Sequence, residues 1–288
     1  MHLEGLAPWG GLPEGEDIAL VGIPYDGSAV YRRGAAGAPA RLRELSKALP
    51  PVTERAERLS LRVHDFGDVE LGESVEGGWK AAADRLAALP RDAFLTVLGG
   101  DHCTLIATLA AQARRHPGLA LVFIDAHPDL NDTSRGGRWT CGCALRRALE
   151  CAGMAGRDVA FAGLRDFDYE EVEFARTNEM LSLNCAEVAR DPLGAGRVLA
   201  GWSAGRPVHV SFDIDVLDPA FAPGTEIPSA AGLSTRQALD LLTGLTEQSR
   251  LVGLDVTEVS PPLDPSDITV YAALKVIFET WGLALGNR

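Results

Sequence analysis

The stretch LALVFIDAHPD, residues 119–129, decides the fold. Its first six residues form a continuous apolar run, which is typical of a strand buried on both faces of a parallel sheet. The run stops at Asp125, and His127 and Asp129 follow at alternate positions. Alternate side chains of an extended chain point to the same side, so these three are expected to lie together. The stretch therefore predicts a buried parallel strand with a polar cluster at its carboxyl end.

Two other apolar runs end in the same way. The run at 94–99 leads into Asp101 and His102, and the run at 208–213 ends in Asp213, with Asp215 two residues later. Ligands of open parallel sheets bind outside the carboxyl ends of the strands. Together the three strand ends offer two imidazoles and at least four carboxylates to one site.

Apolar runs and amphipathic helical patterns alternate along the whole chain, which predicts parallel strands joined by crossover helices. The expected strands are 18–24, 61–69, 94–99, 119–125, 159–164, 208–213 and 251–256. The expected helices are 40–49, 79–89, 105–115, 235–249 and 268–285. No linker, repeat or low-complexity tract interrupts them, so we expect one domain over residues 1–288. The predicted architecture is a three-layer α/β/α fold with a mainly parallel sheet.

The charge balance excludes several kinds of partner. The 288 residues include 27 Lys and Arg against 40 Asp and Glu, a formal net charge of -13. Nucleic acids and anionic membranes bind proteins through cationic side chains, so neither partner is expected. The sequence shows no secretory signal and no segment judged apolar enough to span a bilayer, and its five cysteines are few and odd in number. We therefore expect a cytoplasmic protein with reduced thiols.

The strand-end cluster predicts two metal ions. Four converging carboxylates would repel one another and lose hydration, and two divalent cations cancel their charge. Carboxylates and imidazoles without a thiolate suit Mn²⁺ better than Zn²⁺ or Ca²⁺, with His102 and His127 as terminal ligands. Such a pair of ions lowers the pKa of a bound water toward neutrality. The alternative to metal binding, for a single motif of this kind, is a solvated turn with a hydrogen-bonded histidine.

The motifs at these strand ends resemble those of the ureohydrolase family, which contains arginases and agmatinases. The resemblance rests on Gly99 to His102, Asp125 to Asp129 and Ser211 to Pro219, and it extends to Arg33-Gly34, to 163–168 and to 255–261. It implies an arginase-like fold and hydrolysis of a guanidino compound to urea and an amine. It also implies six metal ligands, which are His102, Asp125, His127, Asp129, Asp213 and Asp215.

The resemblance also suggests roles around the substrate. Glu258, at the end of the last strand, would hold the guanidinium, since a carboxylate pairs bidentately with that planar cation. Asp129 would relay a proton. Asn131, Asp168 and Glu171 resemble arginase residues that hold an α-amino acid. In contrast, the sequence of residues 259–262, Val-Ser-Pro-Pro, resembles the agmatinase branch. Both an α-amino acid and an agmatine-like substrate therefore stay open. Family precedent implies a trimer or hexamer.

Three departures from the family pattern point to an altered substrate. Cys141 stands where the family carries a proton-shuttling His, Glu226-Ile227 replaces a Gly-Thr pair, and Cys103 follows His102 where Ser is commoner. We hypothesise a modified guanidine such as Nω-hydroxy-L-arginine as substrate, and we expect Cys103 to lie close to Cys141 or Cys143. The other readings are an agmatinase, a guanidino acid hydrolase, a formiminoglutamase, or a metal-binding paralogue without activity.

Overall fold

One parallel sheet organises the molecule. The computed structural model describes residues 3–72 and 75–286, and in this part of the chain eight strands form a single sheet with the order β2-β1-β3-β8-β7-β4-β5-β6. Every pairing between these strands is parallel. The strands are β1 (Glu14–Gly22), β2 (Val63–Asp68), β3 (Phe94–Leu98), β4 (Ala120–Ile124), β5 (Val159–Leu164), β6 (Leu181–Asn184), β7 (Pro207–Asp213) and β8 (Arg250–Thr257).

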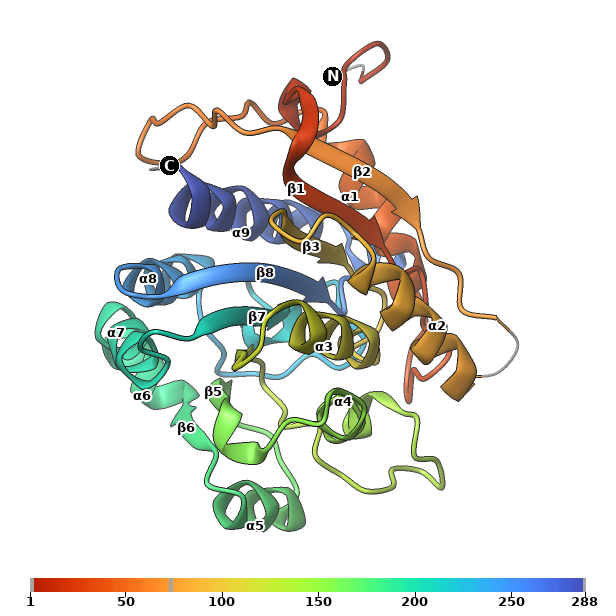
Figure 1. Ribbon diagram of the computed structural model, residues 1–288, viewed down its shortest axis with the longest axis vertical. Helices are drawn as coiled ribbons and strands as arrows, with labels where there is room; N and C mark the ends of the chain where they lie inside the picture. The colour runs from red at the N-terminus through yellow and green to blue at the C-terminus, as the bar shows by residue number, and fades with distance from the viewer. Residues whose placement is uncertain (1–2, 73–74, 287–288) are drawn as a thin grey trace.

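Helices cover both faces of the sheet and give the three layers seen in Figure 1. One face packs against α1 (Ala38–Ser46), α6 (Cys185–Arg190), α7 (Pro192–Trp202), α8 (Thr235–Thr246) and α9 (Ile268–Leu285). The other packs against α2 (Val75–Ala87), α3 (Thr104–Arg115) and α4 (Ala144–Ala152), with α5 (Tyr169–Thr177) beside the end of the sheet that carries β6. The continuous apolar strands are buried because both of their faces are covered.

The expected α/β/α fold with a mainly parallel sheet is confirmed, and all seven expected strands are present with ends shifted by a few residues. The structure adds β6, whose sequence LSLN is short and only partly buried. It also adds α4, α5, α6 and α7, which the sequence analysis did not assign. The eleven residues of α7 include three glycines, which weaken a helical pattern.

Helix α9 corrects one expectation from the sequence. It is long and apolar enough to cross a membrane by length and composition, but 67% of it is buried inside the protein. Trp281 on α9 donates a hydrogen bond from Nε1 to Thr96 Oγ1 on β3 at 2.9 Å. The helix is therefore accounted for as a core element that covers the sheet.

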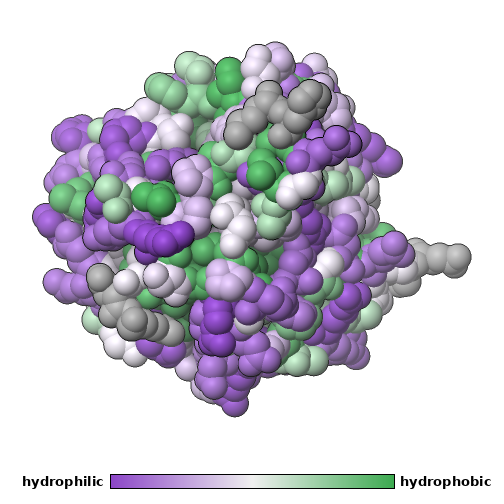
Figure 2. Space-filling view, turned by 90° about the horizontal axis from the view of Figure 1, so that it is seen from above, coloured by the Kyte–Doolittle hydropathy of each residue, from purple (hydrophilic) through white to green (hydrophobic). Residues whose placement is uncertain are grey.

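On the face shown in Figure 2, apolar residues are interrupted by hydrophilic ones.

The carboxyl ends of four adjacent strands, β3, β8, β7 and β4, define the edge where the polar motifs meet. The loop after β3 passes very close to the loop after β1, and Asp101 N donates to Tyr25 O at 2.7 Å. A Cβ at Gly100 would lie only 1.8 Å from that same carbonyl oxygen. Glycine is therefore required at residue 100 for His102 to reach its position.

Candidate metal centre

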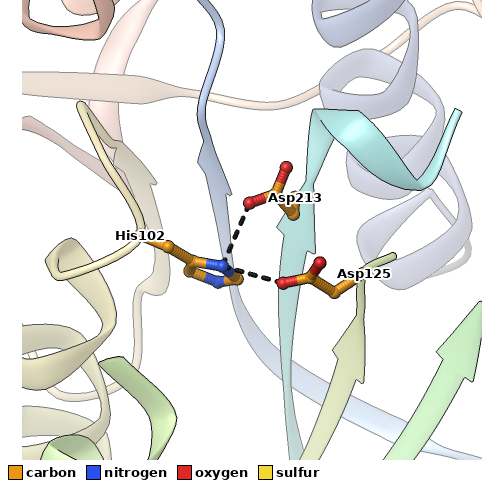
Figure 3. Close-up of side chains that lie close together, drawn as sticks. All are labelled: His102, Asp125 and Asp213. Carbon is orange, nitrogen blue, oxygen red and sulfur yellow. Dashed lines mark ion pairs between the residues drawn. The ribbon is translucent and has the colours of Figure 1, made fainter. Parts of the chain in front are cut away.

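Three side chains from three strand ends at this edge of the sheet point toward one another (Figure 3). His102 follows β3, Asp125 follows β4, and Asp213 ends β7. His102 Nδ1 lies 2.9 Å from Asp125 Oδ2 and 3.0 Å from Asp213 Oδ2. All three residues are buried. The first and third predicted motifs thus meet the second at one point.

A second group shares Asp125 with the first. His127 Nδ1 lies 3.0 Å from Asp215 Oδ2 and 3.6 Å from Asp125 Oδ1. One ligand atom each from Asp125, His127 and Asp215 lie within 4.8 Å of one another, as do those of the first group. Two three-residue groups joined by one carboxylate can hold two ions side by side, as in a binuclear centre.

Asp129 completes the cluster from an unusual backbone conformation. Its φ is 52°, in the left-handed region that a non-glycine residue adopts at a cost of about 1–2 kcal/mol. This conformation turns the chain after β4 so that Asp129 Oδ2 lies 3.4 Å from His102 Nδ1. All six side chains expected as ligands are therefore gathered at the same edge of the sheet.

A buried hydrogen-bond network behind the cluster sets the tautomer of His102. Ser211 Oγ donates to Asp255 Oδ1 at 2.6 Å, so its single proton is committed. His102 Nε2, at 3.0 Å from Ser211 Oγ, must then be the donor of that bond. In the neutral imidazole, Nδ1 is then the nitrogen without a proton, and it faces the carboxylates, as a metal-binding imidazole requires. His209 Nε2 lies 2.6 Å from the other oxygen of Asp255.

The sequence analysis gave neither Ser211 nor Asp255 a role. Ser211 and Asp255 lie directly opposite each other in the register of β7 and β8. A buried Ser and a buried Asp inside two apolar strands were the available signal, because burying an unpaired polar group is costly. The pairing itself required the strand register.

We expect Asp255→Asn to weaken metal binding by roughly 10- to 100-fold, the usual effect of removing the partner that orients a ligand. The amide cannot accept from both Ser211 and His209 as the carboxylate does. Metal content measured against free Mn²⁺ concentration checks this. Asp158→Asn, which removes a partly exposed partner of Arg206, is the control. Equal metal affinity in the two variants would contradict the positioning role.

Two buried polar atoms at the centre of the cluster have no hydrogen-bond partner, which indicates whether the cluster can hold an ion. His102 Nδ1 and Asp125 Oδ2 are buried and form no hydrogen bond of acceptable geometry, although they are only 2.9 Å apart. Buried polar atoms are nearly always satisfied, so this pair needs a common partner. A cation between them would accept both lone pairs, and the oxygen and imidazole donors suit a divalent ion.

The electrostatics also favour cations. Burial and the charges of Asp215 and Asp125 raise the pKa of Asp213 well above its usual value. Burial alone would lower the pKa of His127, but the charges of Asp215 and Asp125 raise it to about 12. The carboxylates therefore repel one another at Asp213 and favour a proton on His127, and a bound cation would supply the balancing positive charge instead.

Glu258 lies beside the cluster at the end of β8. Its φ of 62° is again left-handed, and its Oε1 accepts a hydrogen bond from His102 N at 2.8 Å. Its Oε2 is buried and has no hydrogen-bond partner. Burial and the charges of Asp213, Asp101 and Glu226 raise the pKa of Glu258 well above its ordinary value. This carboxylate is thus held in place with one oxygen available for a ligand.

A cavity of roughly 310 Å³ opens above these residues. Its walls include Asn131, Asp168 and Glu171, as the sequence analysis expected. Glu171, however, accepts hydrogen bonds from Leu130 N and Asp168 N, both at 2.9 Å, one on each carboxylate oxygen. Glu171 therefore holds the loop that carries the other two, and the D-x-x-E spacing of a helix start was the signal for this role.

The buried thiols lie at the side of the cavity. Cys141 Sγ approaches Ser28 O at 3.9 Å, and the Cys103 thiol contacts the side chain of the same serine. Cys143 instead approaches Gly137 O at 3.8 Å. Cys103 and Cys141 thus contact the same serine, which fits the expectation that Cys103 lies close to Cys141 or Cys143, and all five cysteines are free thiols. Burial, followed by the charges of Glu258, Asp129 and Glu226, raises the pKa of Cys141 far above the usual range.

We expect Cys141 to resist alkylation in the native protein although it lines the cavity. Only the thiolate reacts rapidly with iodoacetamide, and these neighbours keep Cys141 protonated. Mass spectrometry after brief labelling at neutral pH should find modification first at Cys151, which is exposed. Labelling in urea, where all cysteines become accessible, serves as the control. Preferential labelling of Cys141 in the native state would contradict the expectation.

Comparison with known proteins identifies the family. The arginase family model matches residues 16–282, which include every residue of the cluster. The chain belongs to the arginase family. Arginase-family enzymes are metal-dependent hydrolases of amidino C–N bonds, and the chain is an enzyme of this class.

Several arginase-family relatives span nearly the whole chain. The mitochondrial guanidino acid hydrolase of Homo sapiens is 35% identical and covers 93% of this chain and 78% of its own. Proclavaminate amidinohydrolase of Streptomyces clavuligerus is 34% identical, covering 92% and 87%. The solved structure of the latter superposes with a TM-score of 0.89 at 30% identity over 98% of both chains. Agmatinase of Bacillus cereus is 32% identical, covering 92% and 91%.

Proposed function

We propose that the protein is a binuclear manganese amidinohydrolase that cleaves the guanidino group of an arginine-like α-amino acid, with Nω-hydroxy-L-arginine as the favoured substrate. The products would be urea or hydroxyurea and an amine such as ornithine. The observation that carries the proposal is the pair of ligand groups joined by Asp125 beneath the cavity that contains Glu258. His102, Asp125, His127, Asp129, Asp213 and Asp215 would hold the ions.

The ions would act as Lewis acids and activate water for attack on the guanidino carbon. The side chains of the cavity do the rest. Glu258 would hold the guanidinium through Oε2, its oxygen without a partner, and orient the carbon toward the cluster. Asp129, which lines the cavity beside His102, would relay a proton to the leaving amine. Cys141 would not perform this transfer, since its raised pKa makes the thiol a poor proton donor.

The mouth of the cavity favours a zwitterionic substrate. Its lining includes an exposed carboxylate, Asp168, and an exposed cation, Arg135, together with the polar residues Asn131 and Ser134. An α-ammonium group can pair with Asp168, and an α-carboxylate with the Arg135 side and the two polar groups. A substrate with a single charge at its far end would leave one of the two sides unmatched.

The second candidate is a guanidino acid hydrolase or agmatinase, favoured by the named relatives at 32–35% identity. A substrate panel with the Mn²⁺-loaded protein decides between them. The panel is Nω-hydroxy-L-arginine, L-arginine, agmatine, 4-guanidinobutyrate and formiminoglutamate. We expect the highest kcat/KM for Nω-hydroxy-L-arginine. A preference for agmatine or guanidinobutyrate would reject the α-amino acid, and release of no product from any compound would favour an inactive paralogue.

A further inference from the structure

Glu226 is a second carboxylate next to Glu258 that the proposed function does not use. It is 3% exposed and lines the same cavity. One ligand atom each from Cys141, Glu226 and Glu258 lie within 4.8 Å of one another. The residue is also one of the departures from the family sequence pattern. Glu226 therefore lies where it can contact a ligand bound in the cavity.

The backbone fixes one oxygen of Glu226 and leaves the other without a partner. Oε1 accepts hydrogen bonds from Tyr31 N and, at 3.3 Å, from Arg32 N. The Arg32 guanidinium donates to the backbone oxygens of Thr225 and Glu226, at 3.3 and 3.0 Å, and forms no ion pair with the carboxylate. Among the described residues, none donates a hydrogen bond to Oε2. The carboxylate is therefore immobilised and not neutralised.

The carboxylates of Glu226 and Glu258 favour binding of a cation in this part of the cavity. Glu226 and Glu258 are both buried, and Cys141 brings no compensating charge. Isolated buried carboxylates are costly unless a positive group pairs with them. A guanidinium is planar and presents five N–H donors, so two carboxylates can engage two of its edges at once. A metal ion could also bridge them, but a protonated thiol is a poor ligand for it.

We propose that Glu226 determines specificity by binding the terminal nitrogen of the substrate's guanidino group through Oε2, while Glu258 binds another edge of the same group. This inference deepens the proposed function and rests on it. The donor at that nitrogen is N–H in a guanidine and N–O–H in an Nω-hydroxyguanidine. A neutral urea lacks the charge that two carboxylates select. Glu226 therefore supplies charge recognition where the family pattern has glycine.

Glu226→Gln tests the proposal with little disturbance, because its amide oxygen can still accept from Tyr31 and Arg32 while the free oxygen becomes an amide. Binding of methylguanidinium and of neutral N-methylurea to the Mn²⁺-loaded protein is measured by ligand-observed NMR. We expect the Kd of methylguanidinium to rise about 10-fold or more, and binding of N-methylurea to stay unchanged. Glu247→Gln, an exposed carboxylate paired with Arg197 before β8, is the matched control.

Three results would overturn the proposal. These are an unchanged Kd in Glu226→Gln, absence of methylguanidinium binding in the unaltered protein, or a loss of one bound metal ion per chain on substitution. The last result would assign Glu226 to a metal. Because the binding assay needs no turnover, it is independent of the substrate panel. If no substrate is hydrolysed but methylguanidinium binding depends on Glu226, the proposed function fails and the assignment of Glu226 stands.

Discussion

Asp125→Asn is expected to remove both metal ions and to lower kcat/KM by roughly 10³-fold or more. Asp125 belongs to both ligand groups, so its loss damages both sites at once. Charge stabilisation by metal ions is worth several kcal/mol, and each 1.4 kcal/mol or so is tenfold in rate. The remaining buried carboxylates and imidazoles keep their positions through backbone contacts, such as the 2.8 Å bond from Asp215 N to Asp213 Oδ1. The effect should therefore be specific to metal binding.

Asp215→Asn provides the graded comparison. Asp215 belongs to one group only, so this variant should retain about one ion per chain while Asp125→Asn retains almost none. Asp84→Asn, which removes an exposed partner of Arg114, should retain both. Metal content by elemental analysis after gel filtration, with kcat/KM for the substrate identified in the panel, measures the effect. Two ions bound to Asp125→Asn would contradict a shared ligand.

Removal of the metals by a chelator is expected to lower the melting temperature by roughly 10 °C or more. A ligand at a thousand times its Kd stabilises a protein by about 4 kcal/mol, and two ions can each contribute on this scale. In a protein of this size 1 kcal/mol corresponds to roughly 2–4 °C. Thermal unfolding with and without EDTA, followed by Mn²⁺ readdition, measures the shift. A melting temperature unaffected by EDTA, with the metals shown to be gone, would contradict this prediction.

The decrease in melting temperature on removal of the metals should become larger as the pH rises from about 5 to 8. In the metal-free protein burial raises the pKa of Asp129 to about 7, and burial with the charges of Asp215 and Asp125 raises the pKa of Asp213 well above its usual value. A carboxyl whose pKa is raised on folding stabilises the folded state below its unfolded pKa, and this stabilisation is lost as the pH rises through the folded value. His127, with its pKa raised to about 12, acts in the same direction. Metal binding instead strengthens as ligands deprotonate.

The sequence predicted the layers and the metal cluster because both depend on local patterns. Apolar runs ending in alternating Asp and His residues identify a strand and its polar end together, as at Asp125 and His127. The network of Ser211 with Asp255 depends on the register between β7 and β8, which a single sequence does not contain. Helix α5 was missed because its residues are largely exposed, and strand β6 was missed because its alternating LSLN pattern is only four residues long.

Glu171 shows that a residue predicted to bind the substrate also has a structural role. Its position near Asp168 suggested direct substrate contact, whereas its two oxygens accept backbone hydrogen bonds that shape the cavity wall. Glu226 shows the opposite case. Its departure from the family pattern was visible in the sequence, but its orientation toward Glu258 became clear only from the anchoring contacts with residues 31 and 32.

The order of the central strands determines when, during synthesis of the chain, the metal ligands can come together. His102, Asp125, Asp213 and Glu258 are separated by up to 156 positions in sequence, yet they stand on four neighbouring strands. Contacts this distant form late and slowly, because long loops must close first. Neither ligand group is complete until β7 has been made, and the group that contains His102 also needs β8, which lies between β3 and β7 in the sheet. We therefore expect the nascent chain to acquire its ions only after synthesis of the sheet is finished, so that metal content reports completed folding.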